Sequence, residues 1–233
     1  MKILHLYHDL MNLYGDYGNI CALQKILTAN GIKSEVDTLS VGDKPHFSDY
    51  DFVYVGSGTE ENQKLALRHL SDYKDELKAY FDSEKTALFT GNSFEMLGNE
   101  INGFSERYEG LGILDFYVSE QNKKRITADI VAEREGLQKP IVGFINKCSE
   151  IYGVANPLFS VKMGVGNNSA SAEEGICEKG FICTHITGPI LIKNPHFLHY
   201  VASRLKDVEL DADRFSYENA AYEITLKKLC ERI

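Results

Sequence analysis

The chain has 233 residues, of which 43% are hydrophobic and 25% are charged, as is typical of a globular protein. Its 34 acidic and 25 basic residues give a formal net charge of -9, which argues against a general nucleic-acid binder because phosphate contacts need a basic surface. The sequence contains no apolar run of about 18 residues, and MKILHLYHDL reaches polar residues too early for a signal peptide. Five cysteines without a CxxC pair predict a protein of the reducing cytoplasm.

The first hundred residues alternate between strand and helix patterns. Apolar residues recur at helical spacing after residue 20, and a long amphipathic helix is expected over residues 60–81. Gly31 is suited to end the first of these helices. The alternation predicts right-handed crossovers and hence an α/β fold, with an open, mostly parallel sheet flanked by helices. Strands are expected at residues 2–8, 33–39, 51–55 and 86–90.

The second half has a different pattern, which predicts extra short strands between residues 110 and 185. A helix is expected after them, capped by Asn194 with Pro195 at its first position, and a last amphipathic helix over residues 216–232. Because no repeat, low-complexity tract or linker interrupts the sequence, residues 1–233 are predicted to form a single domain. The apolar stripe of the last helix is either core or a partner surface, and consists of Tyr217, Ala221, Ile224 and Leu229.

Residues 87–98, ALFTGNSFEMLG, have the layout of a nucleophile elbow. In such an elbow a buried strand runs into a tight turn and then a helix, which lifts one side chain above the sheet. Backbone N–H groups beside that side chain and in a neighbouring Gly-rich loop form an oxyanion hole. Gly56, Ser57 and Gly58 follow the preceding strand and are expected to supply this loop, since ligands of such sheets lie beyond the carboxyl ends of the strands.

Seven segments occur in the order found in a known family: NLYGDYGNI, GSGTEENQ, YEGLGILDFYV, GFINKCSEIY, GVGNN, EEGI and THITGPILIKNP. Through them the chain resembles the class I glutamine amidotransferases of the cobyric acid synthase type, and among these the glutaminase subunits of lipid II isoglutaminyl synthases. The resemblance implies the class I amidotransferase fold. It also implies a subunit that passes ammonia from glutamine to a separate Mur-ligase-like, ATP-dependent amidoligase subunit, which amidates the D-glutamate of peptidoglycan precursors. We expect no cofactor, metal ion or nucleic-acid partner and no membrane span.

Both catalytic positions of the family are replaced in this chain. In the family a cysteine at the elbow attacks the glutamine amide and a histidine on a later strand acts as its base. Here Gly91 stands at the cysteine position and Thr187 at the histidine position, while Glu95 replaces a glutamine and Glu150 an arginine. Glycine has no group that attacks a carbonyl, and threonine is no base near neutral pH. We therefore expect a pseudoenzyme that acts as a partner or regulatory subunit.

Two ways of retaining glutaminase activity stay open at this stage. Ser93 and His185 each lie two residues from a replaced position and could form a relocated nucleophile–base pair, although Ser93 is equally suited to cap the short helix after the elbow. Cys148 lies in a segment that borders the family's site, and it is either a thiol of the cleft or a structural cysteine.

A third hypothesis is a small-molecule-binding module that uses the same cleft. Glu95 and Glu150 would make the cleft more acidic than in the family, which favours an amine over other small ligands; a small amide is the alternative. Asn92 is expected in this pocket too. Arg125 falls on a strand of the family's pattern and either holds a carboxylate or is a surface charge.

Overall fold

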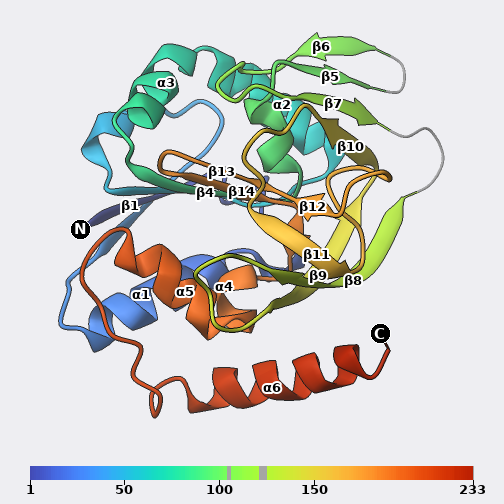
Figure 1. The fold of residues 1–233 in the computed structure, drawn as a ribbon. Helices are drawn as coiled ribbons and strands as arrows, with labels where there is room; N and C mark the ends of the chain where they lie inside the picture. The colour runs from blue at the N-terminus through green and yellow to red at the C-terminus, as the bar shows by residue number, and fades with distance from the viewer. Residues whose placement is uncertain (104–105, 121–124, 233) are drawn as a thin grey trace.

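The central element of the fold is a six-stranded sheet in the order β13-β14-β4-β3-β1-β2 (Figure 1). The computed structural model describes residues 1–103, 106–120 and 125–232. Strands β14, β4, β3, β1 and β2 pair in parallel, and β13 is antiparallel to β14. The predicted open, mostly parallel α/β sheet is therefore confirmed. The strands are β1 Lys2–Leu6, β2 Glu35–Leu39, β3 Phe52–Val55, β4 Thr86–Thr90, β13 Ile176–Glu178 and β14 Phe181–Thr184.

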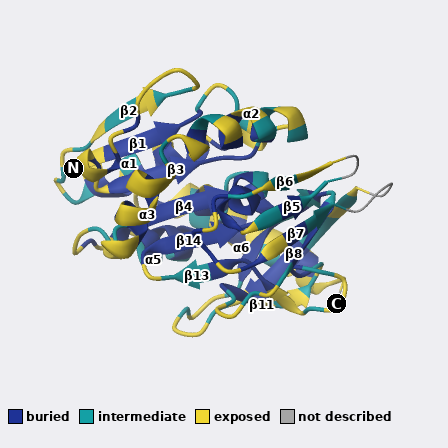
Figure 2. Ribbon diagram, turned by 90° about the horizontal axis from the view of Figure 1, so that it is seen from above, coloured by how far each residue is buried: buried dark blue, intermediate teal, exposed yellow. Residues whose placement is uncertain are grey.

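Helices cover both faces of this sheet, as Figure 1 shows. A hydrophobic core lies between each face of the sheet and the helices that cover it. Alternate side chains of a strand enter one core or the other, because neighbouring residues of a strand point to opposite faces. Val53 packs on the side of α2 and α3, while Phe52 and Tyr54 pack on the side of α1 and α5. The buried strands form the dark centre of Figure 2. The helices are α1 Gly18–Ala29, α2 Glu60–Ser71, α3 Lys74–Asp82, α4 Ile190–Lys193 and α5 Pro195–Ser203.

The expected long helix over residues 60–81 is wrong, because the chain breaks between α2 and α3. Tyr73 leaves the helical conformation, with φ -116° and ψ 16°. Its ring lies against that of His69, with 5.2 Å between the ring centroids. Leu70 of α2 and Leu77 of α3 belong to the same core on either side of the break.

Two further sheets hold most of the extra strands predicted for the second half, while the strand predicted at residues 180–186 begins as β14 of the central sheet. One has the order β12-β11-β8-β9-β15 and the other β10-β7-β5-β6. The expected strand over residues 180–186 divides at His185, where the chain leaves β14 and pairs with β9 as β15. The strands are β5 Glu100–Asn102, β6 Arg107–Glu109, β7 Tyr117–Glu120, β8 Ile126–Glu133, β9 Ile141–Lys147, β10 Ser149–Tyr152, β11 Phe159–Met163, β12 Glu173–Glu174 and β15 Ile186–Thr187.

The last helix, α6 Ser216–Cys230, lies on the outside of the molecule (Figure 1). Its buried side chains are Tyr222 and Leu229. The predicted stripe is therefore only partly core: Leu229 is buried, but Tyr217 and Ile224 are 88% and 60% exposed. Within the described ranges, no helix combines the length and apolar character needed to cross a membrane. The remaining helical turns are the 3-10 helices η1 Leu13–Gly15, η2 Phe47–Asp49 and η3 Gly91–Leu97.

Candidate functional site

The elbow at Gly91 has the geometry that the sequence predicts. Strand β4 ends at Thr90, and Gly91, the first residue of η3, adopts the left-handed region with φ 63°. Ser93 secures the turn, because its hydroxyl donates to the carbonyls of Thr90 and Val55 at 2.8 and 3.0 Å. The elbow backbone is thus intact, although residue 91 offers no side chain.

The structure brings the Gly-rich loop and the replaced base position to this elbow. The Gly58 N–H donates to the Asn92 side chain at 2.9 Å. A Cβ atom on residue 91 would lie 3.2 Å from Cγ2 of Thr187 and 3.2 Å from Oγ of Ser57. Residues 91 and 187, distant in sequence, therefore face each other across the same small space.

Ser93 and His185 do not form the relocated pair. The Ser93 hydroxyl is occupied by two carbonyls, and His185 Nε2 lies 3.0 Å from Oε1 of Glu95. The expected capping role of Ser93 is also wrong: a cap accepts from backbone N–H groups, whereas this hydroxyl donates to backbone oxygen. The reason is that Ser93 lies inside η3, two residues after its first residue.

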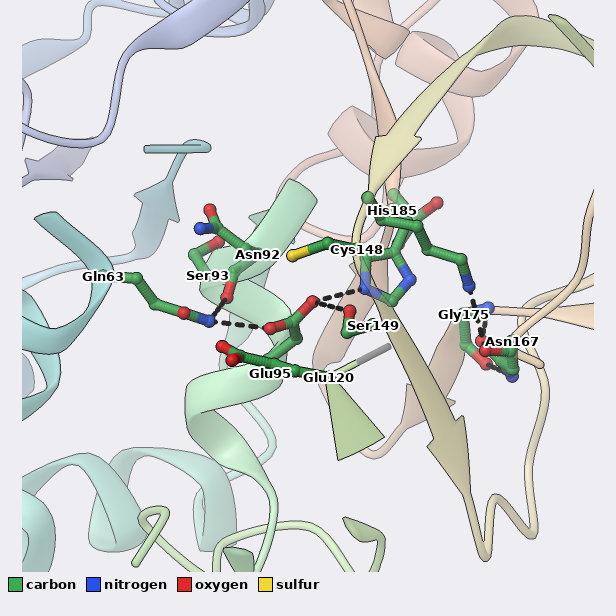
Figure 3. A network of polar contacts seen from close by, with 12 residues as sticks. Gln63, Asn92, Ser93, Glu95, Glu120, Cys148, Ser149, Asn167, Gly175 and His185 are labelled. Carbon is green, nitrogen blue, oxygen red and sulfur yellow. Dashed lines mark hydrogen bonds and ion pairs between the residues drawn. The ribbon is translucent and has the colours of Figure 1, made fainter. Parts of the chain in front are cut away.

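Glu95 is the centre of a buried polar network (Figure 3). Its Oε2 accepts from Nε2 of Gln63 at 2.9 Å, and its Oε1 accepts from the Ser149 hydroxyl as well as meeting His185. Burial lowers the pKa of His185 below its ordinary value. His185 is therefore neutral near pH 7 and donates its Nε2 proton to the carboxylate.

A second buried carboxyl group holds the backbone of His185. Glu174 accepts from the N–H of His185 and from the hydroxyl of Thr184, both at 2.7 Å. Burial raises the pKa of Glu174 to about 7. Sequence reasoning missed this residue and three others in the network, Gln63, Lys147 and Ser149.

The burial of Lys147 follows from the alternation of its strand, although its charge alone favours a surface position. Strand β9 buries Ile141, Gly143 and Ile145, and Lys147 continues this alternation on the same face. The Lys147 ammonium donates to the carbonyls of Gly166 and Asn167 at 2.7 and 2.9 Å. Burial lowers its pKa.

A cavity of about 210 Å³ opens beside the elbow. Arg125 forms an ion pair with Glu60 in its lining and also donates to Asn146 at 3.1 Å. Cys148 donates its thiol proton to Glu60 at 3.2 Å, and burial raises the pKa of this thiol to about 12. The thiol is therefore protonated at neutral pH and is a poor nucleophile. The lining includes Tyr14, Ser57, Glu60, Asn92, Glu95, Arg125, Lys147 and Cys148.

Glu150 lies outside the lining of this cavity, contrary to expectation. Its carboxylate accepts from the Ser169 N–H at 2.7 Å and from the Tyr152 hydroxyl. It follows Cys148 by two residues, but the chain has by then entered β10 and pairs with β7. Among the described residues, no cluster of three or more His, Cys, Asp or Glu side chains is placed to hold a metal ion.

Asp16 is the buried acid of the loop before α1. Its Oδ2 accepts from the N–H of Ser57 at 2.6 Å and from the hydroxyl of the same residue. Burial raises the pKa of Asp16 to about 6. Through these two bonds Asp16 fixes Ser57 against the elbow.

Comparison with known proteins agrees with this geometry. The model of the CobB/CobQ-like glutamine amidotransferase domain matches residues 2–195. The lipid II isoglutaminyl synthase (glutamine-hydrolyzing) subunit GatD of Staphylococcus aureus is 35% identical over 88% of this chain and 84% of its own length. The subunit of the same name from Streptococcus pneumoniae is 30% identical over 91% of this chain and 85% of its own length.

Solved structures share the fold at low sequence identity. A crystal structure of a glutamine amidotransferase has a TM-score of 0.58 and 18% identity, and covers 87% of this chain and 98% of its own. A glutamine amidotransferase from Thermotoga maritima has a TM-score of 0.56 and 12% identity, and covers 100% of this chain and 97% of its own. These likenesses concern the fold.

Proposed function

This chain belongs to the family of CobB/CobQ-like glutamine amidotransferase domains, and from that premise we propose that it is a glutaminase-dead subunit related to those that supply ammonia for amidation of peptidoglycan precursors. The relatives from Staphylococcus aureus and Streptococcus pneumoniae are subunits of a lipid II isoglutaminyl synthase. In this proposal the chain acts in the cytoplasm as a partner or regulatory subunit of a Mur-ligase-like, ATP-dependent amidoligase.

The observation that carries the proposal is the pairing of Gly91 with Thr187 at an intact elbow. Amide hydrolysis by this design needs a nucleophile and a base within hydrogen-bond reach of each other. Neither Gly91 nor Thr187 can act as the nucleophile or as the base. The nearby alternatives are committed elsewhere: Ser93 to carbonyls, His185 to Glu95, and Cys148 to Glu60.

The retained parts support a scaffold role. Loss of a nucleophile or base costs roughly ten-thousand-fold or more in rate, yet the left-handed turn at Gly91 is formed and the Gly-rich loop is bonded to the elbow through Gly58 and Asn92. These parts shape a surface and a cavity without performing chemistry. A binding role explains why the backbone persists around a site that has lost its reacting groups.

The test of this proposal is ammonia release from glutamine by the purified chain, alone and with a co-expressed Mur-ligase-like subunit. The GatD subunit of Staphylococcus aureus is the positive control. We expect no release above the protein-free rate. Release that disappears in S93A, C148A or H185A would contradict the proposal, and co-purification without any ligase-like protein would contradict its partner component.

A second candidate function is binding of a small amide or amino acid without hydrolysis, which the Arg125–Glu60 pair favours. Both side chains line the cavity, and they are partly exposed at 45% and 39%. A guanidinium holds a carboxylate and a carboxylate holds an ammonium group, so a zwitterion inserted between them satisfies both. The pair is thus suited to an α-amino acid of the cavity's size.

Thermal shift and calorimetry with glutamine, glutamate and simple amines test this second function. A ligand of the native state raises the Tm, and R125A should abolish the rise for amino acids. Arg107 forms an exposed ion pair with Glu100 outside this cavity, so R107A is the matched control and should leave binding unchanged. Equal binding to both variants, or no shift at millimolar ligand, would contradict it.

A further inference from the structure

The space above Gly91 is filled by the side chain of Ser57. A Cβ atom on residue 91 would lie less than 3.0 Å from the Cβ of Ser57, a separation that real Cβ atoms essentially never show. The position of a Cβ is set by the backbone and not by the rotamer. Turning the Ser57 side chain therefore does not relieve the contact, and any residue other than glycine at position 91 requires the backbone of Ser57 or of residue 91 to move.

The backbone of Ser57 is held on three sides. Its N–H donates to Asp16 at 2.6 Å, its carbonyl accepts from the Leu13 N–H at 2.9 Å, and the next residue, Gly58, donates to Asn92. The Ser57 hydroxyl adds another bond to Asp16. Ser57 is only 3% exposed. The loop is thus fixed where it excludes a side chain from the elbow.

We propose that Ser57 is a blocking residue, whose Cβ takes the volume that a nucleophile's side chain would need at position 91. The interpretation of position 91 as the former nucleophile position rests on the proposed function, but the steric claim does not. Loss of the nucleophile and occupation of its place by Ser57 are then one coupled change. As a consequence, replacing Gly91 by cysteine and Thr187 by histidine is not sufficient to rebuild the site while Ser57 is present.

A double-mutant cycle of Ser57→Gly and Gly91→Ala tests the coupling by thermal unfolding. We expect G91A to lower the Tm by about 10 °C in the native background, from overpacking together with the left-handed conformation of residue 91. In the S57G background the same change should lower the Tm by only about 3–5 °C, because the contact with the Ser57 Cβ is removed and the conformational strain is then the main cost.

Ser57→Ala is the control that separates the Cβ from the hydroxyl. This variant keeps the Cβ and removes the hydroxyl bond to Asp16. Adding G91A to S57A should therefore lower the Tm by as much as adding G91A to the native chain. If G91A does not yield folded protein, recovery of folded S57G/G91A supports the proposal. Equal losses in the native and S57G backgrounds, or a failure of S57G/G91A to fold when S57G folds, would overturn it.

The cycle measures stability and does not depend on whether the chain hydrolyses glutamine. Ammonia release by the native chain would therefore contradict the proposed function and leave the steric claim standing. Covalent labelling of Ser57 in the native chain by an electrophilic glutamine analogue would overturn the blocking role itself, because the hydroxyl would then be a nucleophile.

Discussion

His185 and Glu95 are 90 residues apart in the sequence, and their side chains meet at 3.0 Å between Nε2 and Oε1. Both are almost completely buried, at 1% and 4% side-chain exposure. One comes from the turn between β14 and β15 and the other from η3. The contact therefore joins the segment that carries Thr187 to the segment that carries Gly91, which fixes the two replaced positions relative to each other.

Removing the Glu95 carboxylate should destabilise the fold strongly. Glu95→Ala leaves the donors of Gln63, Ser149 and His185 without their acceptor, and each buried unsatisfied group costs about 1–3 kcal/mol. We expect the free energy of unfolding in urea to fall by about 3 kcal/mol or more. Glu95→Gln keeps one acceptor oxygen and should lose about 1–2 kcal/mol.

The exposed residue Glu109 provides the control for Glu95. Glu109→Ala should change stability by no more than about 0.5 kcal/mol, as surface substitutions usually do. A Glu95→Ala variant as stable as Glu109→Ala would show that the three donors find other partners and that the network does not hold the elbow.

Glu174 should make the stability of the protein depend on pH. Because burial raises its folded pKa to about 7 from the ordinary 4.5, the native state keeps a proton that the unfolded chain loses first. The resulting stabilisation is complete below about pH 4.5 and is lost as the pH rises through about 7. The side chain in Glu174→Gln is neutral at every pH. The free energy of unfolding of the native chain, relative to that of this variant, should therefore fall by about 2–3 kcal/mol from pH 5 to pH 8.

Urea unfolding of both proteins at four pH values measures this difference. The control is Glu173→Gln, which removes an exposed carboxylate from the same short strand. Its stability difference from the native chain should stay constant across the range. If the stability difference between Glu174→Gln and the native chain is also constant with pH, Glu174 is ionised in the folded protein over the whole pH range measured.

The sequence predicted the central sheet because its strands are apolar runs long enough to recognise, such as residues 86–90. The three-residue strands β5 and β6 were missed, since three residues are too few to show a period of two. Asn194 illustrates a correct position with a wrong role. It precedes α5 as expected, but its side chain bonds to the N–H and carbonyl of Val142 at 2.8 and 2.9 Å and not to the N–H groups of the helix.

The candidate site was predictable where it depends on local chain geometry. The elbow turn follows from a buried strand with a glycine directly after it, and the structure places Gly91 and Thr187 together. The polar network was not predictable, because the partners of Glu95 lie 32, 54 and 90 residues away and those of Lys147 lie 19 and 20 residues away. A charged residue in isolation favours a surface position, and only the three-dimensional pairing makes its burial tolerable.

Cys148 should react slowly with alkylating reagents in the native state. Its thiol pKa is raised to about 12 by burial and by Glu60, so at pH 8 its thiolate fraction is on the order of a thousand-fold lower than that of an ordinary cysteine. We expect mass spectrometry after iodoacetamide treatment to find Cys21 and Cys230, which are exposed, modified long before Cys148.

Glu60→Gln should accelerate the alkylation of Cys148 several-fold, because it removes a negative charge beside the thiol. Glu61→Gln changes an exposed neighbour on the same helix and should have no effect. Labelling of Cys148 as fast as that of Cys21 in the native chain would indicate an activated thiol, and Cys148 would return as a candidate nucleophile.

Tyr217 and Tyr222 lie on the same helix, α6, and should respond in opposite ways to truncation. Tyr222 is 2% exposed, packs against the ring of His196 and donates its hydroxyl to the Pro140 carbonyl at 2.7 Å. Tyr222→Ala should therefore lower the free energy of unfolding by about 3–4 kcal/mol, and Tyr222→Phe by about 1 kcal/mol. Tyr217 is 88% exposed, so Tyr217→Ala should change the free energy of unfolding by no more than about 0.5 kcal/mol. Urea unfolding measures all three, and equal losses for both alanine variants would mean that α6 packs through its other face.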